Sequence, residues 1–287
     1  MRIAVTAASG QLGQLVIAQL LERTEAKNIV ALARQPEKLA DLATQGIEVR
    51  PFDYNQTAAQ LAEQLKDIDK LLLISSSEIG QRVIQHQHVI DAAQLAQIKL
   101  IVYTSLLKAD TSTLVLAQEH VVTEQYLKAS LQPYTILRNN WYSENYAMGL
   151  ADAVEHGKIF GATHHAKIAS ASRLDYATAA AVVLMQAGHD NKTYELAGDQ
   201  YYTLDDVASW ASGFSHKPVI YTDLSELEYQ ALLIKEGLPE TFAAVLANSD
   251  QGASQGDLYS DSLDLSRLIG RATTAMQDTI RTFLLPS

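Results

Sequence analysis

The stretch TAASGQLG at residues 6–13 places glycines where a chain can approach a phosphate group closely. A loop that cradles a pyrophosphate needs a tight turn, backbone N–H groups near the phosphates, and close contact between strand and helix. Gly10 and Gly13 can meet the last two needs. Ala7 stands at the turn, where its methyl group costs little only if φ stays negative. The spacing predicts a dinucleotide-binding loop, with an ordinary strand-to-helix turn as the alternative.

Polar groups beside these glycines favour the same chemistry. Thr6 and Ser9 add hydroxyl groups to the loop. A helix predicted to begin near Gln11 would present the positive end of its dipole to an anion. We therefore expect the loop to bind the pyrophosphate of a dinucleotide.

The residue after the second predicted strand indicates which dinucleotide is preferred. Proteins that prefer NAD usually place an acidic residue there, whereas an arginine accommodates the 2′-phosphate of NADP. This chain has Arg34, with Lys38 a turn further on. NADPH is therefore the expected cofactor, although a surface arginine after a strand is also common. Asp53, after the third strand, could accept a hydrogen bond from the adenine amino group or could cap the following turn.

Small hydroxyl side chains follow the fourth and fifth predicted strands. Ser75, Ser76 and Ser77 come after one strand, and Tyr103 and Thr104 end the next. Each serine or threonine taken singly is more often a helix cap. Their convergence at one sheet edge predicts a surface for the ribose and nicotinamide of the cofactor.

The acid–base pair typical of short-chain dehydrogenases is missing. No tyrosine of the 13 has a lysine four residues later, so the usual Tyr-x-x-x-Lys proton donor is absent. His120 and Glu124 lie one turn apart in the helical stretch at this position. They could be an acid–base pair, a metal pair, or a polar helix face in which His120 positions the cofactor. Two ligands without a third make a poor metal site, and we expect no metal.

A chain without a dedicated general acid is poorly suited to reduce an ordinary ketone, because the developing alkoxide lacks a proton donor. A more electrophilic acceptor such as a quinone avoids this problem. Its reduction yields a stabilised hydroquinone anion that can take its proton from water. Holding the ring close to the nicotinamide would then supply most of the rate enhancement.

These residues need a sheet to bring them together, and the first 140 residues predict one. Six apolar runs alternate with helical patterns, and the runs lack strict alternation, as expected of strands buried on both faces. This order predicts a doubly wound parallel sheet of the Rossmann type, which binds ligands at the carboxyl ends of its strands. The runs span residues 3–6, 28–33, 47–50, 70–75, 99–105 and 134–138.

The second half of the chain is less regular. A helical pattern at 175–186 and a strand-like run at 192–198 are followed by two capping-box openings, at Thr203 and Ser225. We predict an α/β protein with an NADP-binding core over 1–140 and a smaller C-terminal α/β substrate lobe over 141–287, interwoven with the core.

Composition limits the remaining possibilities. The 287 residues include no cysteine, which excludes disulfides and thiolate chemistry. The net charge of −11 argues against nucleic acid as a partner. No apolar run approaches the length that spans a bilayer, and the first residues lack the pattern of a signal peptide. We expect a cytoplasmic protein that acts on a small molecule and does not bind membranes.

Several segments in order resemble the NmrA-like group of atypical short-chain dehydrogenases, and within it the bacterial NADPH:quinone oxidoreductases. The resemblance covers nearly the whole chain. The matching segments are TAASGQLG, KLLLISSSEIGQR, IVYTSLL, EHVVTEQYL, LRNNWYSENY, KIASASRLDYA, YELAGD and SRLIGR. It implies a Rossmann domain with a small C-terminal lobe, and a quinone cleft that works without flavin. The family's loop begins with glycine where this chain has Ala7, a departure that bears on affinity more than on fold.

The resemblance also implies roles for individual residues. The cofactor-binding positions are Thr6, Ala7, Ser9, Gly10, Gln11, Leu12, Arg34, Asp53, Ser75, Ser76, Ser77, Tyr103, Thr104 and Asn139. The substrate positions are Glu78, Trp141, Tyr142, Asn145 and Arg173. The candidates for a direct catalytic role are Tyr142, Asn139 and His120. The aromatic block that contains Trp141, Tyr142 and Tyr146 could instead serve only to pack the two lobes together.

Three functions fit these expectations. The first is an NADPH-dependent quinone reductase. The second is a non-catalytic redox sensor that binds NADP(H) and signals to a protein partner, as NmrA-like proteins without Tyr-x-x-x-Lys can do. The third is a reductase of another activated acceptor, such as a cationic dye. A ring-sized aromatic block beside Asn139 favours an enzyme over a sensor. A homodimer is the expected assembly.

Overall fold

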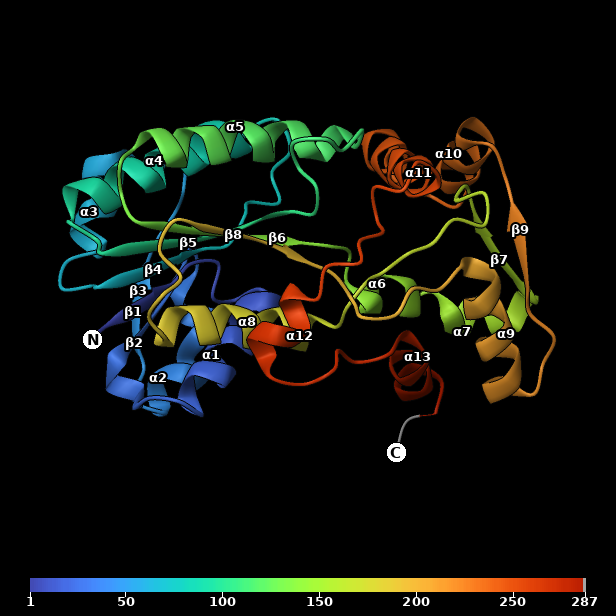
Figure 1. The fold of residues 1–287 in the computed structure, drawn as a ribbon, viewed down its shortest axis with the longest axis horizontal. Helices are drawn as coiled ribbons and strands as arrows, with labels where there is room; N and C mark the ends of the chain where they lie inside the picture. Colours follow the sequence, from blue (N-terminus) through green and yellow to red (C-terminus); the bar gives the residue numbers. More distant parts are fainter. Residues whose placement is uncertain (286–287) are drawn as a thin grey trace. The chain divides into compact units, whose positions relative to one another are not determined.

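The structure is a computed structural model that describes residues 1–285 (Figure 1). The chain divides into two compact units. Unit 1 comprises Met1–Ala109, Gln118–Asn139 and Arg173–Tyr194. Unit 2 comprises Asp110–Ala117, Asn140–Ser172 and the chain from Glu195 onward. Each unit therefore contains segments from both predicted halves, and the division at residue 140 stays a prediction.

A seven-stranded sheet confirms the predicted Rossmann-type fold. Its strand order is β3-β2-β1-β4-β5-β6-β8, and the five neighbouring pairs from β3 to β6 are parallel. All six strands predicted in the first 140 residues are present. Five of them are mostly buried, whereas β3 is an edge strand whose residues are exposed or half-buried. The strands are β1 (Ile3–Val5), β2 (Ile29–Ala33), β3 (Glu48–Pro51), β4 (Lys70–Leu73), β5 (Leu100–Leu106), β6 (Tyr134–Asn139) and β8 (Lys192–Leu196).

Helices cover both faces of this sheet, as Figure 1 shows. On one face α1 packs against α8, and on the other α3 packs against α4. The helices of this layer structure are α1 (Gln11–Leu21), α2 (Ala40–Thr44), α3 (Ala58–Gln64), α4 (Arg82–Leu95), α5 (Val115–Ala129) and α8 (Arg173–Met185). Two short 3₁₀ helices, η1 (Ala26–Asn28) and η2 (Pro36–Leu39), flank β2.

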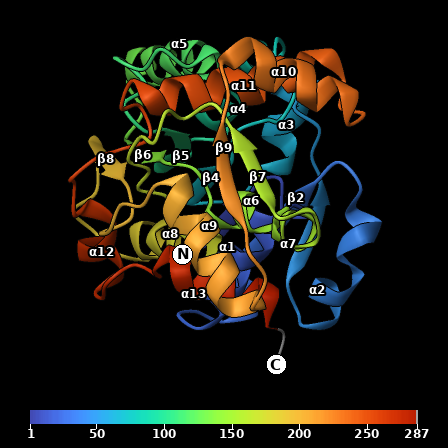
Figure 2. The same cartoon turned by 90° about the vertical axis from the view of Figure 1, so that its right-hand side faces the viewer.

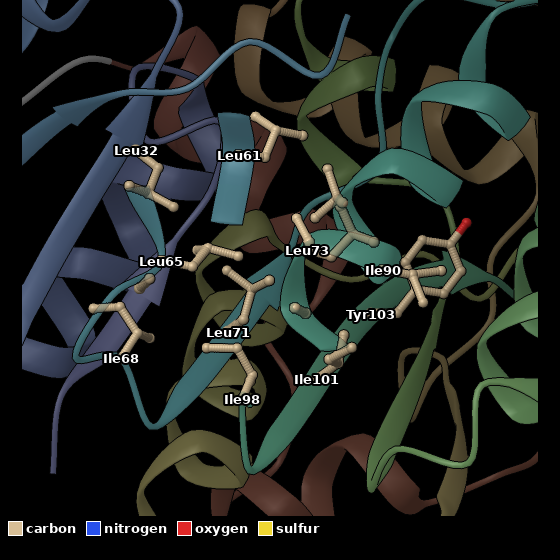
Figure 3. Packing of buried hydrophobic residues seen from close by; sticks show 14 of the residues in the cluster. Leu32, Leu61, Leu65, Ile68, Leu71, Leu73, Ile90, Ile98, Ile101 and Tyr103 are labelled. Atoms are coloured by element: carbon tan, nitrogen blue, oxygen red, sulfur yellow. The ribbon is translucent and has the colours of Figure 1, made fainter. Parts of the chain in front are cut away.

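The core of unit 1 lies between the sheet and the layer of α3 and α4 (Figure 3). Leu71 of β4 and Ile101 of β5 meet Leu61 of α3, Leu65 at the end of that helix and Ile90 of α4 there, and all five are fully buried. Burying one such side chain stabilises a fold by about 1.5–3 kcal/mol. The core therefore fixes the strand ends rigidly.

The strand order reverses between β1 and β4, which sets the place where a ligand can enter. A doubly wound sheet forms a crevice at the carboxyl ends of the two strands on either side of such a reversal. Thr6 follows β1 directly, and Ile74 follows β4. The loops after these two strands are therefore the expected position of a ligand site.

Unit 2 combines a small sheet with several helices. Strands β7 (Lys158–Gly161) and β9 (Ile220–Asp223) run parallel and adjacent (Figure 2). Helix α10 packs against α11, and α13 packs against α9. The predicted capping boxes at Thr203 and Ser225 are confirmed, and they open α9 and α10. The helices are α6 (Ser143–Ala147), α7 (Leu150–His156), α9 (Leu204–Ser215), α10 (Glu226–Lys235), α11 (Glu240–Ser254), α12 (Asp264–Ile269) and α13 (Met276–Leu284).

Over residues 1–285, none of the helices has the length and apolar character needed to cross a membrane.

Candidate functional site

The N-terminus of α1 is open toward an anion. Gly10 is the residue before the helix, and no side chain caps it. The first backbone hydrogen bond of the helix runs from the N–H of Gln14 to the carbonyl of Gly10 (3.0 Å). Within residues 1–285, the N–H groups of Gln11, Leu12 and Gly13 have no acceptor, and the first turn holds no acidic residue. Such a helix end attracts phosphate by its dipole and its unpaired donors.

The turn before α1 brings the loop and the helix into close contact. The carbonyl of Ala7 accepts a hydrogen bond from the N–H of Gly10 (2.9 Å). A methyl group on Gly13 would lie 2.5 Å from that carbonyl oxygen. Gly13 is therefore required for the close approach of helix and strand, as the sequence predicts. The hydroxyl-bearing Ser9 is exposed on the same turn.

Ala7 does not meet the condition under which its methyl group would be harmless. Its φ is +47°, in the left-handed region that favours glycine. A side chain in this region costs about 1–2 kcal/mol. The turn keeps its shape because the hydrogen bonds of its neighbours hold it, with the N–H of Ala8 donating to the carbonyl of Leu32 (3.0 Å).

Replacing Ala7 by glycine is expected to raise the free energy of unfolding by about 0.5–1 kcal/mol, because the strain is relieved at a modest entropic cost. Urea denaturation of the full chain measures the change. Ala8→Gly is the matched control, because Ala8 is buried and is not among the residues with positive φ. That control should destabilise the protein. A destabilising effect of both substitutions would show that the turn is not strained.

Thr6 joins the two strands that border the crevice. Its hydroxyl donates to the carbonyl of Leu72 (3.0 Å) and accepts from the N–H of Ile74 (2.9 Å). The hydroxyl of Tyr54 donates to the carbonyl of Ile74 (2.8 Å) and also contacts the Thr6 hydroxyl. The Thr6 side chain is fully buried, so its hydroxyl holds β1 and β4 together. A role for Thr6 toward the phosphates stays a prediction.

Arg34 lies just beyond the end of β2, where the sequence places it, and it has a partner. Its guanidinium is 2.6 Å from the carboxylate of Glu78, and the Arg34 side chain is 60% exposed. The Gln85 amide donates to Glu78 (2.7 Å) and to the side-chain oxygen of Asn55 (3.1 Å). The N–H of Asn55 donates in turn to Asp53 (3.0 Å). Asp53 therefore caps a turn, which is the alternative that the sequence left open for it.

The serine segment after β4 is held in place from several sides. The N–H of Ser75 donates to the hydroxyl of Thr104 (2.9 Å), and the N–H of Ser76 donates to Nε2 of His86 (2.9 Å). The guanidinium of Arg82 donates to the carbonyl of Ser76 (2.7 Å). These contacts make the segment a fixed wall at the sheet edge. Ser77 continues it as an exposed residue.

His86 is a neutral support. Burial, aided by the positive charge of Arg82, lowers the pKa of His86 to about 3. Because its Nε2 accepts the N–H of Ser76, the proton sits on Nδ1, which faces the hydroxyl of Thr123 (3.1 Å). The imidazole therefore keeps one protonation state around neutral pH and positions the serine segment without transferring protons.

Tyr103 and His120 form a buried pair. The Tyr103 hydroxyl is 2.6 Å from Nδ1 of His120, and the tyrosine ring belongs to the core cluster (Figure 3). Burial raises the pKa of Tyr103 and lowers the pKa of His120 well below its usual range. His120 is thus a neutral imidazole and a poor acid. The Tyr103 ring is covered by core residues. The predicted approach of Tyr103 to the nicotinamide stays a prediction.

His120 and Glu124 lie on a buried face of α5, and the predicted part of His120 in positioning the cofactor stays a prediction. Their exposures are 6% and 2%, because this face of α5 turns inward. Glu124 forms a two-pronged ion pair with Arg138 (2.9 and 2.8 Å) and accepts a hydrogen bond from Ser105 (2.7 Å). The carboxylate is therefore committed to the fold, and no cluster of residues 1–285 has the makeup of a metal site.

Asn139 is the last residue of β6, and its side-chain amide is buried. Its side chain is 6% exposed, and Oδ1 has no hydrogen-bond partner within residues 1–285. Its backbone carbonyl accepts from the N–H of Leu107 (3.0 Å), which fixes its position. An unpaired buried acceptor costs about 1–3 kcal/mol, so the amide suits a ligand that brings an N–H group.

The remaining predicted substrate residues belong to different parts of the chain. Trp141 and Tyr142 are half-buried in unit 2, where Tyr142 forms a short parallel bridge with Ala171. Asn145 is exposed on α6 and borders a pocket of the same unit. Arg173 begins α8 in unit 1. The structure thus brings the strand-end residues of unit 1 together and gathers Trp141, Tyr142 and Asn145 in one segment of unit 2.

Sequence reasoning missed Tyr54, Arg82 and His86, which hold the loops of the candidate site. The last two had a detectable signal: they are four residues apart at the start of α4, and so lie on the same helix face directly after the serines. Tyr54 gave no such signal, because its contacts with Thr6 and Ile74 join segments distant in sequence.

The sequence profile of the NAD(P)H-binding family matches residues 7–197. The chain belongs to this family. The matched range begins in the turn between β1 and α1 and ends just after β8, so it includes every strand of the large sheet except β1.

Three relatives of this family are similar over almost the entire chain. Quinone oxidoreductase 2 of Escherichia coli is 52% identical over 278 residues, which is 97% of each chain. A crystal structure of that organism's NADPH-dependent quinone oxidoreductase with NADPH has a TM-score of 0.95 and covers 97% of this chain and 98% of its own. The NADP(H) complex of Citrobacter sp. triphenylmethane reductase reaches 0.95 at 38% identity, covering 98% and 100%. An NmrA-like oxidoreductase of Aspergillus flavus is 24% identical over 99% of this chain and 95% of its own.

The residues present fit the dinucleotide of this family. Three unpaired N–H groups at the start of α1 match the charge of a pyrophosphate. The unpaired Oδ1 of Asn139 can accept from an amide group such as that of a nicotinamide. Arg34 provides a cation at the position that separates NADP from NAD.

Proposed function

We propose that this chain is an NADPH-dependent quinone reductase that works without flavin. The observation that carries the proposal is the 52% identity, over 97% of each chain, to a protein named quinone oxidoreductase 2. The site supports it independently, because its donors and its cation fit NADPH and its buried groups provide no strong acid.

The chain's own residues hold the two ends of the cofactor. The N–H groups of Gln11, Leu12 and Gly13 bind the pyrophosphate at the end of α1. Arg34 binds the 2′-phosphate, which replaces the carboxylate of Glu78 as its partner. Asn139 accepts a hydrogen bond from the carboxamide. When bound, NADPH supplies a hydride from its nicotinamide ring.

The kind of acceptor follows from the lack of a strong acid among the residues of the site. Transfer of a hydride to a quinone oxygen would break a C–H bond of the donor and form an O–H bond. The ring becomes aromatic as both carbonyl groups turn into C–O bonds, which leaves a hydroquinone monoanion that takes one proton from water. The hydride supplies two electrons and one proton, and the proton from water is the second that a hydroquinone needs. His120 has no part as the acid, because its low pKa keeps it neutral. Binding and orientation of the ring therefore carry the rate enhancement.

Trp141 and Tyr142 are the residues that we propose for orienting the acceptor. Both are half-buried, so each offers part of a flat apolar face. Stacking of an aromatic ring on such a face contributes about 0.5–1.5 kcal/mol beyond the area buried. Asn145, Arg173 and Glu78 stay in the predicted set of substrate residues.

A cationic dye is a second candidate acceptor. The observation that favours it is the TM-score of 0.95 and 38% identity to the triphenylmethane reductase of Citrobacter sp.. A triphenylmethane cation accepts a hydride at carbon and needs no proton, so the same arrangement of residues would serve it.

The test is NADPH oxidation by the purified full chain with three acceptors. We expect turnover with 1,4-benzoquinone and none with acetophenone, an unactivated ketone that needs a proton donor. Crystal violet tests the dye. Tyr142→Ala should reduce quinone turnover about tenfold through the loss of stacking and positioning, while Tyr201→Ala, which removes an exposed tyrosine, should not. Binding of NADPH without turnover on any acceptor would overturn the proposal in favour of a redox sensor.

Cytoplasmic location and assembly as a homodimer belong to this proposal as predictions. A small molecule is the partner that the chemistry requires.

A further inference from the structure

Unit 2 contains a pocket of about 320 Å³. This volume is at the lower end of the range for small-molecule sites. Its wall is formed by α6, α7, β7, α9, α10 and α11, and all of its lining residues belong to unit 2. None of them is a strand-end residue of the dinucleotide site. One lining residue, Asn145, is also in the predicted set of substrate residues, but the apolar wall and the buried polar groups of the pocket do not depend on that role.

The wall of this pocket is mainly apolar. Phe160 of β7, Leu204 and Val207 of α9, and Leu232 and Leu233 of α10 line it. Such a surface favours an apolar ring over a strongly hydrated group.

Tyr146 brings a polar group to the wall of the pocket. The hydroxyl of Tyr146 on α6 is buried and makes no hydrogen bond within residues 1–285. Burial raises the pKa of Tyr146 well above its usual range, so the group remains an O–H donor. The ring is held by an edge contact with Tyr202, whose centroid is 6.1 Å away. A buried donor without an acceptor costs about 1–3 kcal/mol, which a ligand oxygen would recover.

Asp250 supplies an acceptor to the same pocket. Its side chain is 8% exposed, and one carboxylate oxygen accepts from the N–H of Ala162 (2.9 Å). The other oxygen has no hydrogen-bond partner within the described residues. Tyr146, Tyr229 and Asp250 all line this one pocket. The pocket thus offers one O–H donor and one carboxylate acceptor near each other.

These groups select the chemistry of the ligand. Asp250 repels an anion, and an ammonium group cannot accept the hydrogen bond from Tyr146. A hydroxyl group can accept from Tyr146 and donate to Asp250 at the same time. We propose that this pocket binds a small neutral phenol, with its ring against the leucines of α9 and α10 and its hydroxyl between Tyr146 and Asp250.

The experiment uses the full chain with saturating NADPH and two probes of matched shape, 1-naphthol and 1-methoxynaphthalene. Calorimetry measures affinity, and amide chemical shifts locate the binding site. We expect 1-naphthol to bind at least tenfold more tightly than its methyl ether, which cannot donate. The shifted amides should include Gly149 and Ile159, which line the pocket.

Three variants separate this proposal from its alternatives. Tyr146→Phe should keep its melting temperature, because it removes an unpaired hydroxyl, and should weaken 1-naphthol binding about tenfold. Leu233→Trp should block binding by filling the pocket. Tyr201→Phe changes an exposed tyrosine of the same unit and should bind as wild type. Equal affinity of wild type, Tyr146→Phe and Leu233→Trp, or shifts confined to the α1 loop, would overturn the proposal.

Discussion

Replacing Arg34 by alanine is expected to raise the KM for NADPH about 10- to 100-fold and to leave the KM for NADH within about twofold. A hydrogen-bonded contact to a charged group contributes about 1.5–3 kcal/mol, which corresponds to this range. The loss should exceed that of the contact alone, because Glu78 would keep its carboxylate near the 2′-phosphate without a cation beside it. Steady-state kinetics with both cofactors and a fixed quinone measures the effect.

Two control variants sharpen this result. Arg23→Ala removes another ion-paired arginine of unit 1, next to Glu22, and should leave both KM values unchanged. Glu78→Gln removes the negative partner and should preserve the preference for NADPH. If Arg34→Ala weakened NADPH and NADH equally, Arg34 would have no role at the 2′-phosphate.

Replacing Arg138 by methionine is expected to lower the free energy of unfolding by about 3–5 kcal/mol. The carboxylate of Glu124 is 2% exposed and would lose both bonds to the guanidinium, keeping among residues 1–285 only the Ser105 hydroxyl (2.7 Å) and the more distant ammonium of Lys128 (3.4 Å). Urea denaturation measures the loss. The exposed pair of Lys27 and Glu25 is the reference, because Lys27→Met should cost about 1 kcal/mol or less.

The double variant Arg138→Met, Glu124→Leu keeps this prediction testable if the single variant does not fold. It removes both buried charges and should recover most of the stability, although Ser105 loses an acceptor. A double variant that is less stable than Arg138→Met would show that the ion pair is not the source of the loss.

The sheet could be predicted from sequence because its signal is local. Five of the six predicted strands are apolar runs between helical patterns, and their burial leaves little ambiguity. The exposed edge strand β3 followed from the alternation of strands and helices. The position of Arg34 after β2 follows from the same alternation. The capping boxes at Thr203 and Ser225 were equally visible, since a cap depends on residues three apart.

Contacts between distant segments could not be predicted in the same way. The polarity of His120 and Glu124 predicted a polar helix face but did not show that this face is buried. Arg138, fourteen residues beyond Glu124, pairs with its carboxylate inside the protein. Glu78 was grouped with the substrate residues, and its contact with Arg34 spans 44 positions.

The backbone conformation of single residues could not be predicted from the sequence either. The sequence showed that the sign of φ at Ala7 matters but did not reveal it, because φ depends on the hydrogen bonds of the folded turn. The pocket around Tyr146 and Asp250 gave no sequence signal, because it needs helices separated by a hundred residues.

The central claim is that the chain passes a hydride from NADPH to a quinone without flavin. The most direct measurement is a single-turnover reaction in flavin-free buffer, with the full chain loaded with NADPH that carries deuterium at the transferred position of nicotinamide C4. We predict that 1,4-benzoquinone is reduced to hydroquinone, and that the step is slower with the deuterated cofactor. Reduction that requires added flavin, or no quinone-dependent loss of NADPH at all, would contradict the account.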